Sequence, residues 1–244
     1  MNKKSITNII LDNIKTIIGA LIIAIIIRSL IFQPFYIPSS SMEPTLLIGD
    51  RIFVSKSTYG FSKHSFPFSP NIFSQRIFYE NPRQGDLVVF KTPADNRTDY
   101  IKRLIGLPGD EIQFIEGNIF INDKQIVRKK INSRNLVRCG KFSFKVNTYE
   151  EILPNGAKHI AAYNESGTLQ NTKKFKVPEN HFFLLGDNRD CSKDSRYLGS
   201  VSVVNLVGKA QIIFFSNDTV KGSLLKFWNL KNSFRFDRLF KKIK

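Results

Sequence analysis

An uninterrupted apolar run near the N-terminus constrains this chain more than any other feature of its sequence. Residues 16–32 read TIIGALIIAIIIRSLIF, and no charged residue occurs between Ile17 and Ile27. As a helix, this run extends about 25 Å at about 1.5 Å per residue, which approaches the thickness of the apolar core of a bilayer. Arg28 lies near the end of the run, where a long basic side chain can reach the headgroups. We therefore predict a transmembrane anchor over residues 16–32, preceded by a short segment, residues 1–15.

Two other interpretations of the run remain open, a buried helix of a soluble protein and a cleavable secretory signal sequence. Lys3 and Lys4 suit the basic start of a signal sequence. The run is followed by QPFYIP, without a clear pair of small residues for cleavage, so an uncleaved anchor is preferred. Lys3, Lys4 and Lys15 precede the span and favour a cytoplasmic N-terminus, with the body on the outer side of the membrane.

The body of the chain, residues 33–216, has the pattern of a mainly β domain. Short runs rich in Val, Ile and Phe are bounded by Gly, Pro, Asn or Asp, and Glu116-Gly117 suits a hairpin turn. No amphipathic helix alternates with these runs, so an antiparallel sheet is expected rather than a parallel one. Residues 59–82, rich in Ser, Pro and Phe, are expected to form an apolar loop near the membrane. The expected strands are residues 50–55, 86–91, 111–115, 118–121, 181–185 and 203–215.

The charge of the chain points to an anionic partner. There are 37 Lys and Arg residues against 20 Asp and Glu, a formal net charge of +17. Beside a membrane anchor, this charge favours anionic lipids over nucleic acid, for which the sequence offers no motif. In residues 217–244 aromatic and basic residues interleave, which suits either a helix lying in the membrane interface or a frayed basic tail.

No metal or cofactor is predicted. Two Cys residues are too few for a typical structural zinc site. Asp187, Asp190 and Asp194 suggest a calcium loop as an alternative, but the spacing, the central Gly and the terminal Glu of an EF-hand are absent. Arg189 and Lys193 would also repel a cation at this place.

Three segments carry residues suited to catalysis. Residues 37–46 read IPSSSMEPTL, residues 99–110 read DYIKRLIGLPGD, and residues 186–197 read GDNRDCSKDSRY. A serine becomes a nucleophile only beside a base. A lysine that is desolvated in an apolar strand has a lowered pKa and can supply that base. Lys102 has such apolar neighbours, although a solvated lysine on the face of a sheet remains the alternative.

These segments, in this order behind an N-terminal anchor, resemble the bacterial type I signal peptidases, the membrane-anchored serine–lysine proteases that remove signal peptides. The resemblance runs from the anchor to about Phe215 and implies an antiparallel β-sheet catalytic domain of the signal-peptidase/SOS-repressor protease type. It implies that Ser41 is the nucleophile and Lys102 the general base. The Ser39 hydroxyl and the Ser41 backbone N–H would form the oxyanion hole.

The resemblance also implies supporting residues and a substrate. Ser192 would hydrogen-bond the Lys102 amine, Asp194 and Arg196 would pair and hold the Ser192 loop, and Arg103 and Asp187 would be structural partners. The substrates would be signal peptides of exported preproteins, cut after small residues at the outer (periplasmic) face of the bacterial inner membrane. The residues implied to line the substrate pockets are Phe35, Ile37, Pro38, Met42, Leu46, Tyr100 and Ile101.

The sequence departs from the family pattern at two positions. Ser40 stands where the family often has Gly, and Cys191 where it usually has Asn. Cys139 and Cys191 could pair in an oxidising compartment, but two free thiols are expected. Two further functions remain open: a related serine–lysine protease that cleaves itself, and a membrane-tethered β-domain without catalytic activity.

Overall fold

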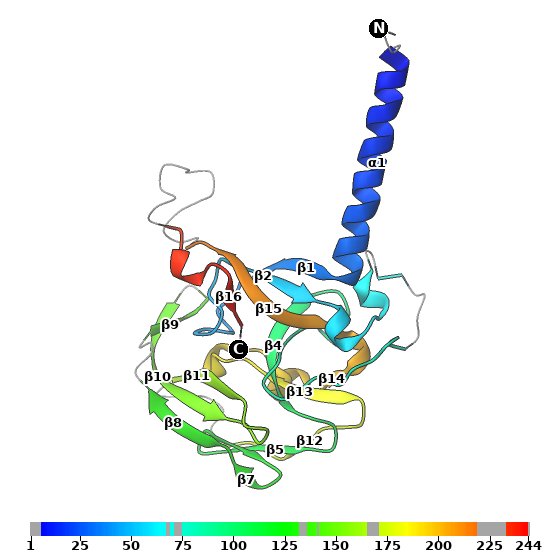
Figure 1. The fold of residues 1–244 in the computed structure, drawn as a ribbon. Coiled ribbons are helices and arrows are strands. Elements are labelled where there is room, and N and C mark those ends of the chain that lie inside the picture. The colour runs from blue at the N-terminus through cyan, green and yellow to red at the C-terminus, as the bar shows by residue number, and fades with distance from the viewer. Residues whose placement is uncertain are drawn as a thin grey trace.

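A single long helix, α1 (Ile6–Leu30), projects from a body of antiparallel strands (Figure 1). The structure is a computed structural model that describes residues 6–66, 69–70, 75–131, 136–140, 142–164, 171–218 and 233–243. Within α1, the 18-residue stretch Ile9–Ile26 has a mean hydropathy of 2.2, and none of it is buried. The helix begins ten residues before the predicted span and ends before Phe32, which already belongs to β1 (Phe32–Tyr36). The difference arises because residues 6–15, ITNIILDNIK, extend the same helix although half of them are polar or charged, whereas the prediction covered the apolar run alone.

The largest sheet carries the segments in which catalytic residues are expected. Its strands follow the order β1-β2-β15-β3-β4-β13-β14, and every neighbouring pair is antiparallel. The predicted mainly β, antiparallel architecture is therefore confirmed. The bounds are β2 (Asp50–Ser55), β3 (Leu87–Lys91), β4 (Asp99–Gly106), β13 (His181–Leu185), β14 (Val201–Ser202) and β15 (Leu206–Ser216).

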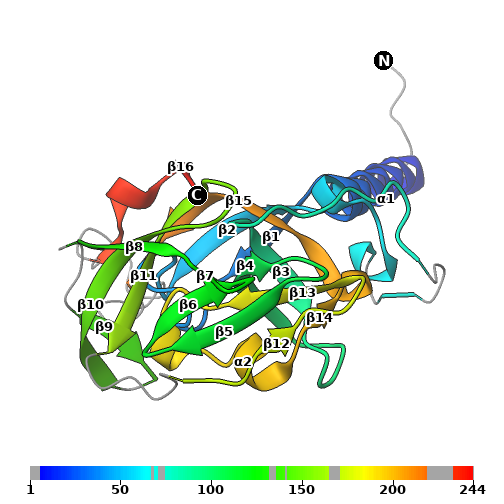
Figure 2. The same cartoon turned by 90° about the horizontal axis from the view of Figure 1, so that it is seen from below.

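Two smaller sheets complete the body. One pairs β5 (Glu111–Ile115) with β6 (Asn118–Ile121) and β12 (Phe175–Lys176), and β6 with β7 (Lys124–Gln125). These strands lie at the end of the body away from α1 (Figures 1 and 2). The other sheet is built on the long strand β10 and was not expected from the sequence. Its strands are β8 (Val127–Ile131), β9 (Leu136–Cys139), β10 (Phe142–Ile152) and β11 (Lys158–Asn164).

The predicted hairpin between residues 111 and 121 is confirmed. Ile115 pairs with Asn118, so the loop consists of Glu116 and Gly117 alone. Both residues have positive φ, 49° and 73°, as a two-residue turn of this type requires. The run predicted as a strand from Val203 instead begins with a short 3₁₀ turn, η4 (Val203–Asn205), before β15.

The predicted apolar loop after residue 59 is fastened to the body. Tyr59 is buried, and its hydroxyl donates to the Asp86 carboxylate at 2.9 Å. The Arg76 guanidinium donates to the carbonyl oxygens of Tyr59, Gly60 and Leu206. Phe78 is 80% exposed. The loop therefore has a fixed base and an exposed apolar part.

The end of the C-terminal segment is neither a helix nor a tail. Residues 233–243 form a 3₁₀ turn, η6 (Phe236–Arg238), and a short strand, β16 (Lys241–Lys242), which pairs with β15. Arg238 is buried and donates to the Asp50 carboxylate at 2.6 Å. Asp50 is fully buried, and a buried carboxylate is stable only beside a cation. The ion pair with Arg238 therefore holds the segment against the body. Residues 219–232 and 244 lie outside the described residues.

Candidate active site

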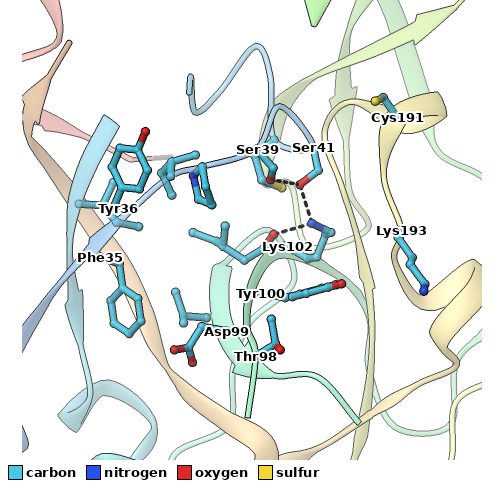
Figure 3. Close-up of a pocket in the computed structure, with 16 residues that line it drawn as sticks. Phe35, Tyr36, Ser39, Ser41, Thr98, Asp99, Tyr100, Lys102, Cys191 and Lys193 are labelled. Carbon is cyan, nitrogen blue, oxygen red and sulfur yellow. Dashed lines mark hydrogen bonds between the residues drawn. The ribbon is translucent and has the colours of Figure 1, made fainter. Parts of the chain in front are cut away.

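The side chains of Ser41 and Lys102 meet, although 61 residues separate them in the sequence. Lys102 Nζ donates to Ser41 Oγ at 2.7 Å (Figure 3). Ser41 lies in the loop between β1 and β2, and Lys102 lies in β4, where it pairs with Val88 of β3. Met42 next to Ser41 is buried in a hydrophobic cluster, which presses the serine loop against the sheet.

The surroundings of Lys102 favour a neutral amine. The residue is 3% exposed, and burial lowers its pKa to about 8, although the carboxylates of Asp194 and Asp187 favour the charged form. Lys102 Nζ also donates to the Ile101 carbonyl oxygen at 2.9 Å and lies 5.5 Å from the centre of the Tyr100 ring. The amine is therefore fixed in position and loses its proton far more readily than a solvated lysine.

The serine loop is held by Asn188, a residue that sequence reasoning did not single out. The Asn188 backbone N–H donates to the Ser41 carbonyl oxygen at 3.1 Å, and its Nδ2 donates to the Ser40 carbonyl oxygen at 3.1 Å. Ser39 is exposed, and its Oγ lies 3.4 Å from Ser41 Oγ. Ser40 has no positive φ, so this backbone does not require the glycine that the family often has there.

The predicted hydrogen bond between Ser192 and the Lys102 amine is absent. Ser192 Oγ is buried and has no hydrogen-bond partner in the part of the chain that the structure describes. Lys102 Nζ is already directed to Ser41 and Ile101. Ser192 Oγ instead faces Gly186, where a Cβ atom would clash with it and with the Ser41 carbonyl oxygen. Gly186 is thus the point at which the two serine loops approach each other.

Asp194 and Arg196 form the predicted pair. Arg196 Nε donates to Asp194 Oδ1 at 2.8 Å, and both side chains are almost fully buried. Asp194 also accepts from the Gly186 backbone N–H at 3.0 Å. It precedes the one-turn helix α2 (Ser195–Leu198) as its N-cap. This aspartate therefore ties both ends of the loop that carries Ser192.

A buried ion pair joins the three segments that carry residues suited to catalysis. Arg103 donates to both carboxylate oxygens of Asp187, at 2.8 and 2.7 Å. The Thr45 hydroxyl donates to the same carboxylate at 2.5 Å. Burial alone would raise the pKa of Asp187, but the charge and hydrogen bonds of Arg103 lower it. One residue from each segment thus meets at a single carboxylate, next to the Ser41 loop.

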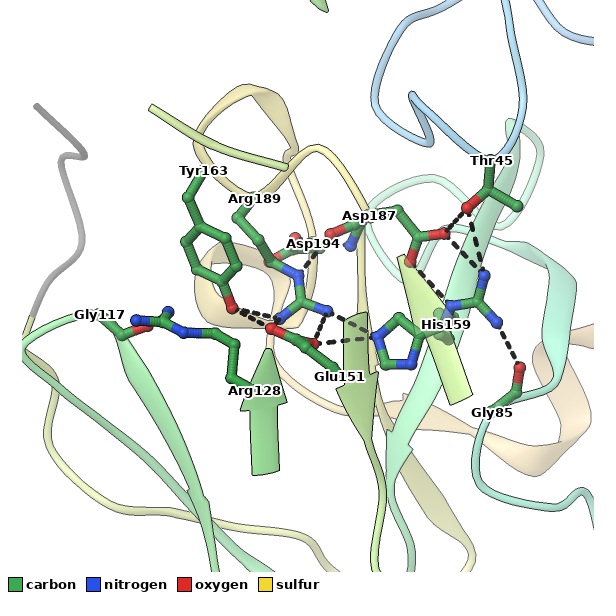
Figure 4. A network of polar contacts seen from close by, with 12 residues as sticks. Thr45, Gly85, Gly117, Arg128, Glu151, His159, Tyr163, Asp187, Arg189 and Asp194 are labelled. Atoms are coloured by element: carbon green, nitrogen blue, oxygen red, sulfur yellow. Dashed lines mark hydrogen bonds and ion pairs between the residues drawn. The ribbon is translucent and has the colours of Figure 1, made fainter. Parts of the chain in front are cut away.

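A second buried network lies behind the Ser192 loop (Figure 4). Arg189 donates to Glu151 Oε2 at 2.8 Å, and His159 Nε2 lies 3.0 Å from the same oxygen. The Tyr163 hydroxyl donates to Glu151. Burial opposes ionisation of Glu151, but Arg189 and the surrounding donors lower its pKa to about 2. This network was not predicted because Glu151, His159 and Tyr163 lie on β10 and β11, which were not expected from the sequence, whereas Arg189 in η3 was considered only as a charge that would repel a cation.

A pocket of about 560 Å³ opens beside Ser41 and Lys102. Among the residues implied to bind substrate, Phe35, Ile37, Pro38, Met42, Tyr100 and Ile101 line it. Leu46 does not, because its side chain is fully buried and packs in the hydrophobic cluster beneath the loop. Lining residues not anticipated from the sequence are Tyr36, Ile52, Val89, Thr98, Asp99, Cys191 and Lys193 (Figure 3).

The expectation of two free thiols is wrong. Cys139 and Cys191 form a disulfide with a Cα–Cα distance of 5.6 Å. The 3₁₀ turn η3 (Arg189–Cys191) brings Cys191 to the end of β9, and Asn188 Nδ2 donates to the Arg138 carbonyl oxygen at 3.0 Å beside it. This bond links β9 to the wall of the pocket.

The aspartates of the candidate calcium loop are engaged by groups of the protein itself. Asp187 and Asp194 pair with arginines, and Asp190 accepts from the Asn164 backbone N–H at 2.7 Å. Among the described residues, no group of three or more His, Cys, Asp or Glu is placed to hold a metal ion.

Comparison with known proteins identifies a family. Residues 10–215 match the family described as signal peptidase, peptidase S26. The chain is 42% identical to signal peptidase I of Rickettsia typhi, with 91% of this chain and 89% of that one covered, and 41% identical to that of Rickettsia prowazekii with the same coverage. A crystal structure of a signal peptidase I from Enterococcus faecalis V583 matches at 25% identity and a TM-score of 0.33, covering 53% of this chain and 97% of that chain. The chain therefore belongs to the signal peptidases of the peptidase S26 family and is a peptide-bond hydrolase.

Proposed function

We propose that Ser41 and Lys102 carry out the signal-peptide removal for which this family is known. The observation that carries the proposal is the 2.7 Å contact between Lys102 Nζ and Ser41 Oγ, made by a lysine that is 3% exposed. A buried amine with a lowered pKa next to a hydroxyl is the arrangement that activates a serine nucleophile.

The steps follow from this geometry. Neutral Lys102 takes the proton of Ser41 Oγ as that oxygen attacks the scissile carbonyl. The oxyanion accepts hydrogen bonds from the Ser41 backbone N–H and the exposed Ser39 hydroxyl. Lys102, now an ammonium, returns the proton to the departing amine and leaves an acyl group on Ser41. Lys102 then takes a proton from a water molecule, whose oxygen attacks the acyl carbon. The bond from this carbon to Ser41 Oγ breaks, Lys102 returns the proton to Ser41 Oγ, and the signal peptide leaves with a new C-terminal carboxyl group.

The pocket supports an extended substrate with small side chains. Residues 35–39 and residues 98–101 line it, and they precede Ser41 and Lys102 in the chain. An extended peptide between these segments would bind through its main chain, and its alternate side chains would point to the pocket floor. Phe35, Met42 and Ile101 occupy part of that space, so residues one and three before the scissile bond would be small.

The proposed location is the bacterial inner membrane, with α1 as the anchor, the N-terminus in the cytoplasm and the body in the periplasm. Lys3, Lys4 and Lys15 support this orientation. The Cys139–Cys191 disulfide also suits an oxidising compartment outside the cytoplasm. The net charge of +17 and exposed apolar side chains such as Phe78 would favour contact with anionic lipids.

The test is cleavage of a synthetic signal peptide with an Ala-x-Ala site by the full chain in neutral detergent. Ser41→Ala and Lys102→Ala should each abolish cleavage while the protein stays folded by circular dichroism. Ser143→Ala, on an exposed part of β10, is the matched control and should cleave like the wild type. Unchanged cleavage by Ser41→Ala would refute the proposed nucleophile.

A further inference from the structure

A second, smaller pocket lies where the anchor helix meets the body. Its volume is about 190 Å³, and four of its lining residues are basic: Arg28, Lys56, His64 and Lys91. Asp99 is the acidic residue in its lining. Phe35 and Asp99 line this pocket and also the larger pocket beside Ser41. The basic pocket therefore adjoins the proposed substrate site but takes no part in the reaction described above.

The position of Arg28 sets the level of the pocket relative to a bilayer. The apolar stretch of α1 ends at Ile26, and Arg28 follows two residues later, about 3 Å further along a helix axis. When this stretch spans the apolar core of a bilayer, Arg28 lies at the level of the headgroups, where lipid phosphates are found. The other basic residues of the pocket belong to the body and meet Arg28 at that level.

The basic groups of the pocket exceed their acidic partners. Lys91 pairs with Asp99 at 2.9 Å. Arg28 and Lys56 form no ion pair with a described acidic residue. Lys56 is only 2% exposed, and its Nζ donates to the Ser65 carbonyl oxygen at 2.5 Å. A buried ammonium that forms no ion pair is costly, and an anion in the pocket would relieve that cost.

The pKa values in the pocket agree with this excess of positive charge. Burial, and then the charge of Arg28, lower the pKa of Lys56 to about 8, although the charge of Asp99, which is paired with Lys91, acts in the opposite direction. Burial and the neighbouring Lys63, Lys91 and Arg76 lower the pKa of His64 to about 4. His64 is therefore neutral near pH 7, and its Nδ1 lies 3.1 Å from Ser69 Oγ. Two cations, Arg28 and Lys56, remain for a ligand.

We infer that this pocket binds the phosphate group of an anionic phospholipid headgroup. Arg28 and Lys56 would donate charge-assisted hydrogen bonds to the phosphate oxygens. A zwitterionic lipid carries its own cation into a site that already has two, so an anionic lipid is favoured. The inference rests on the proposed membrane anchor and adds a defined lipid contact to it. Because Phe35 and Asp99 separate the two pockets, a bound headgroup would fix the substrate site at a set height above the bilayer.

The test measures lipid binding by the full chain in neutral detergent, with calorimetric titration of dihexanoyl phosphatidylglycerol. Wild type should bind with a saturable, one-to-one isotherm. Arg28→Gln/Lys56→Met should weaken binding about tenfold or more, as expected for two lost charged contacts. Arg28→Gln alone, at an exposed side chain, should weaken it severalfold and covers the case in which the Lys56 substitution impairs folding.

Three controls separate the outcomes. Lys129→Gln/Lys130→Gln removes the same charge from exposed positions of β8 and should bind like the wild type, whereas an equal loss would show general attraction and overturn the inference. Inorganic phosphate that binds as tightly as the lipid would mark a free-phosphate site and would also overturn it. Ser41→Ala should keep lipid binding, so failure of the proposed catalytic pair and failure of this site are distinguishable.

Discussion

The protonation of Lys102 leads to a quantitative prediction for the pH dependence of cleavage. With a pKa of about 8, roughly one-tenth of the Lys102 amines are neutral at pH 7. With the ordinary value of 10.5, only about one in 3,000 would be. Burial of this residue therefore supplies about 300-fold more of the basic form at neutral pH.

The assay is kcat/KM for an Ala-x-Ala signal peptide from pH 5.5 to pH 10, with the full chain in neutral detergent. We expect kcat/KM to rise about tenfold per pH unit below pH 8 and to level off above it, because only the neutral amine accepts the serine proton. The peptide should contain no group that titrates near pH 8.

A matched control is available because burial also lowers the pKa of Lys56 to about 8. Lys56 does not line the pocket beside Ser41, so Lys56→Gln should keep the midpoint of the wild-type profile. A profile that still climbs at pH 10 would refute the desolvated base. A midpoint that shifts in Lys56→Gln would show that the pH profile reports Lys56 and not Lys102.

Three further predictions concern stability, each measured by unfolding in detergent. Lys102→Met should stabilise the protein by up to about 3 kcal/mol at pH 6.5. Because the pKa of Lys102 is lower in the folded protein than in the unfolded chain, the charged lysine destabilises the fold fully below pH 8 and progressively less towards pH 10.5. A stabilisation by Lys102→Met that does not shrink at pH 10 would contradict this. Cys191→Ser should cost about 2–4 kcal/mol by opening the bond to Cys139, and reductant should affect the wild type but not the variant. Arg238→Met should cost about 3 kcal/mol because it removes the nearest cation from buried Asp50, and Arg238→Met/Asp50→Asn should recover part of that loss.

Local patterns in the sequence were sufficient for several strands. The bounds of residues 50–55, 111–115, 118–121 and 181–185 agree with β2, β5, β6 and β13. Each of these runs is short, rich in β-branched or aromatic residues and closed by turn residues, so neighbouring residues alone define it. The hairpin turn at Glu116-Gly117 is likewise defined by neighbouring residues alone. The meeting of Ser41 with Lys102 was implied only by family resemblance, since nothing near either residue specifies the other.

The parts that sequence reasoning missed depend on contacts between distant segments. The disulfide requires the end of β9 to meet η3, and β9 was not predicted. Ser192 was expected at the Lys102 amine, but its orientation depends on the space above Gly186. Arg238 was expected in a helix or tail because its partner Asp50 lies 188 residues away. In each case the sequence contained a polar or thiol residue that would require a partner once buried, and this requirement was the available signal.

The arrangement of the buried charges explains how a loop can present a nucleophile accurately. Ser41 lies outside any strand, so the sheet does not fix its position directly. Its carbonyl oxygen is held by Asn188, whose neighbour Asp187 is bound by Arg103, and Arg103 is the residue after Lys102 in β4. The serine and the lysine are therefore joined by a short chain of buried contacts as well as by their own hydrogen bond. Because breaking any link would leave a buried charge or polar group unpaired, the pair is held in place before a substrate arrives.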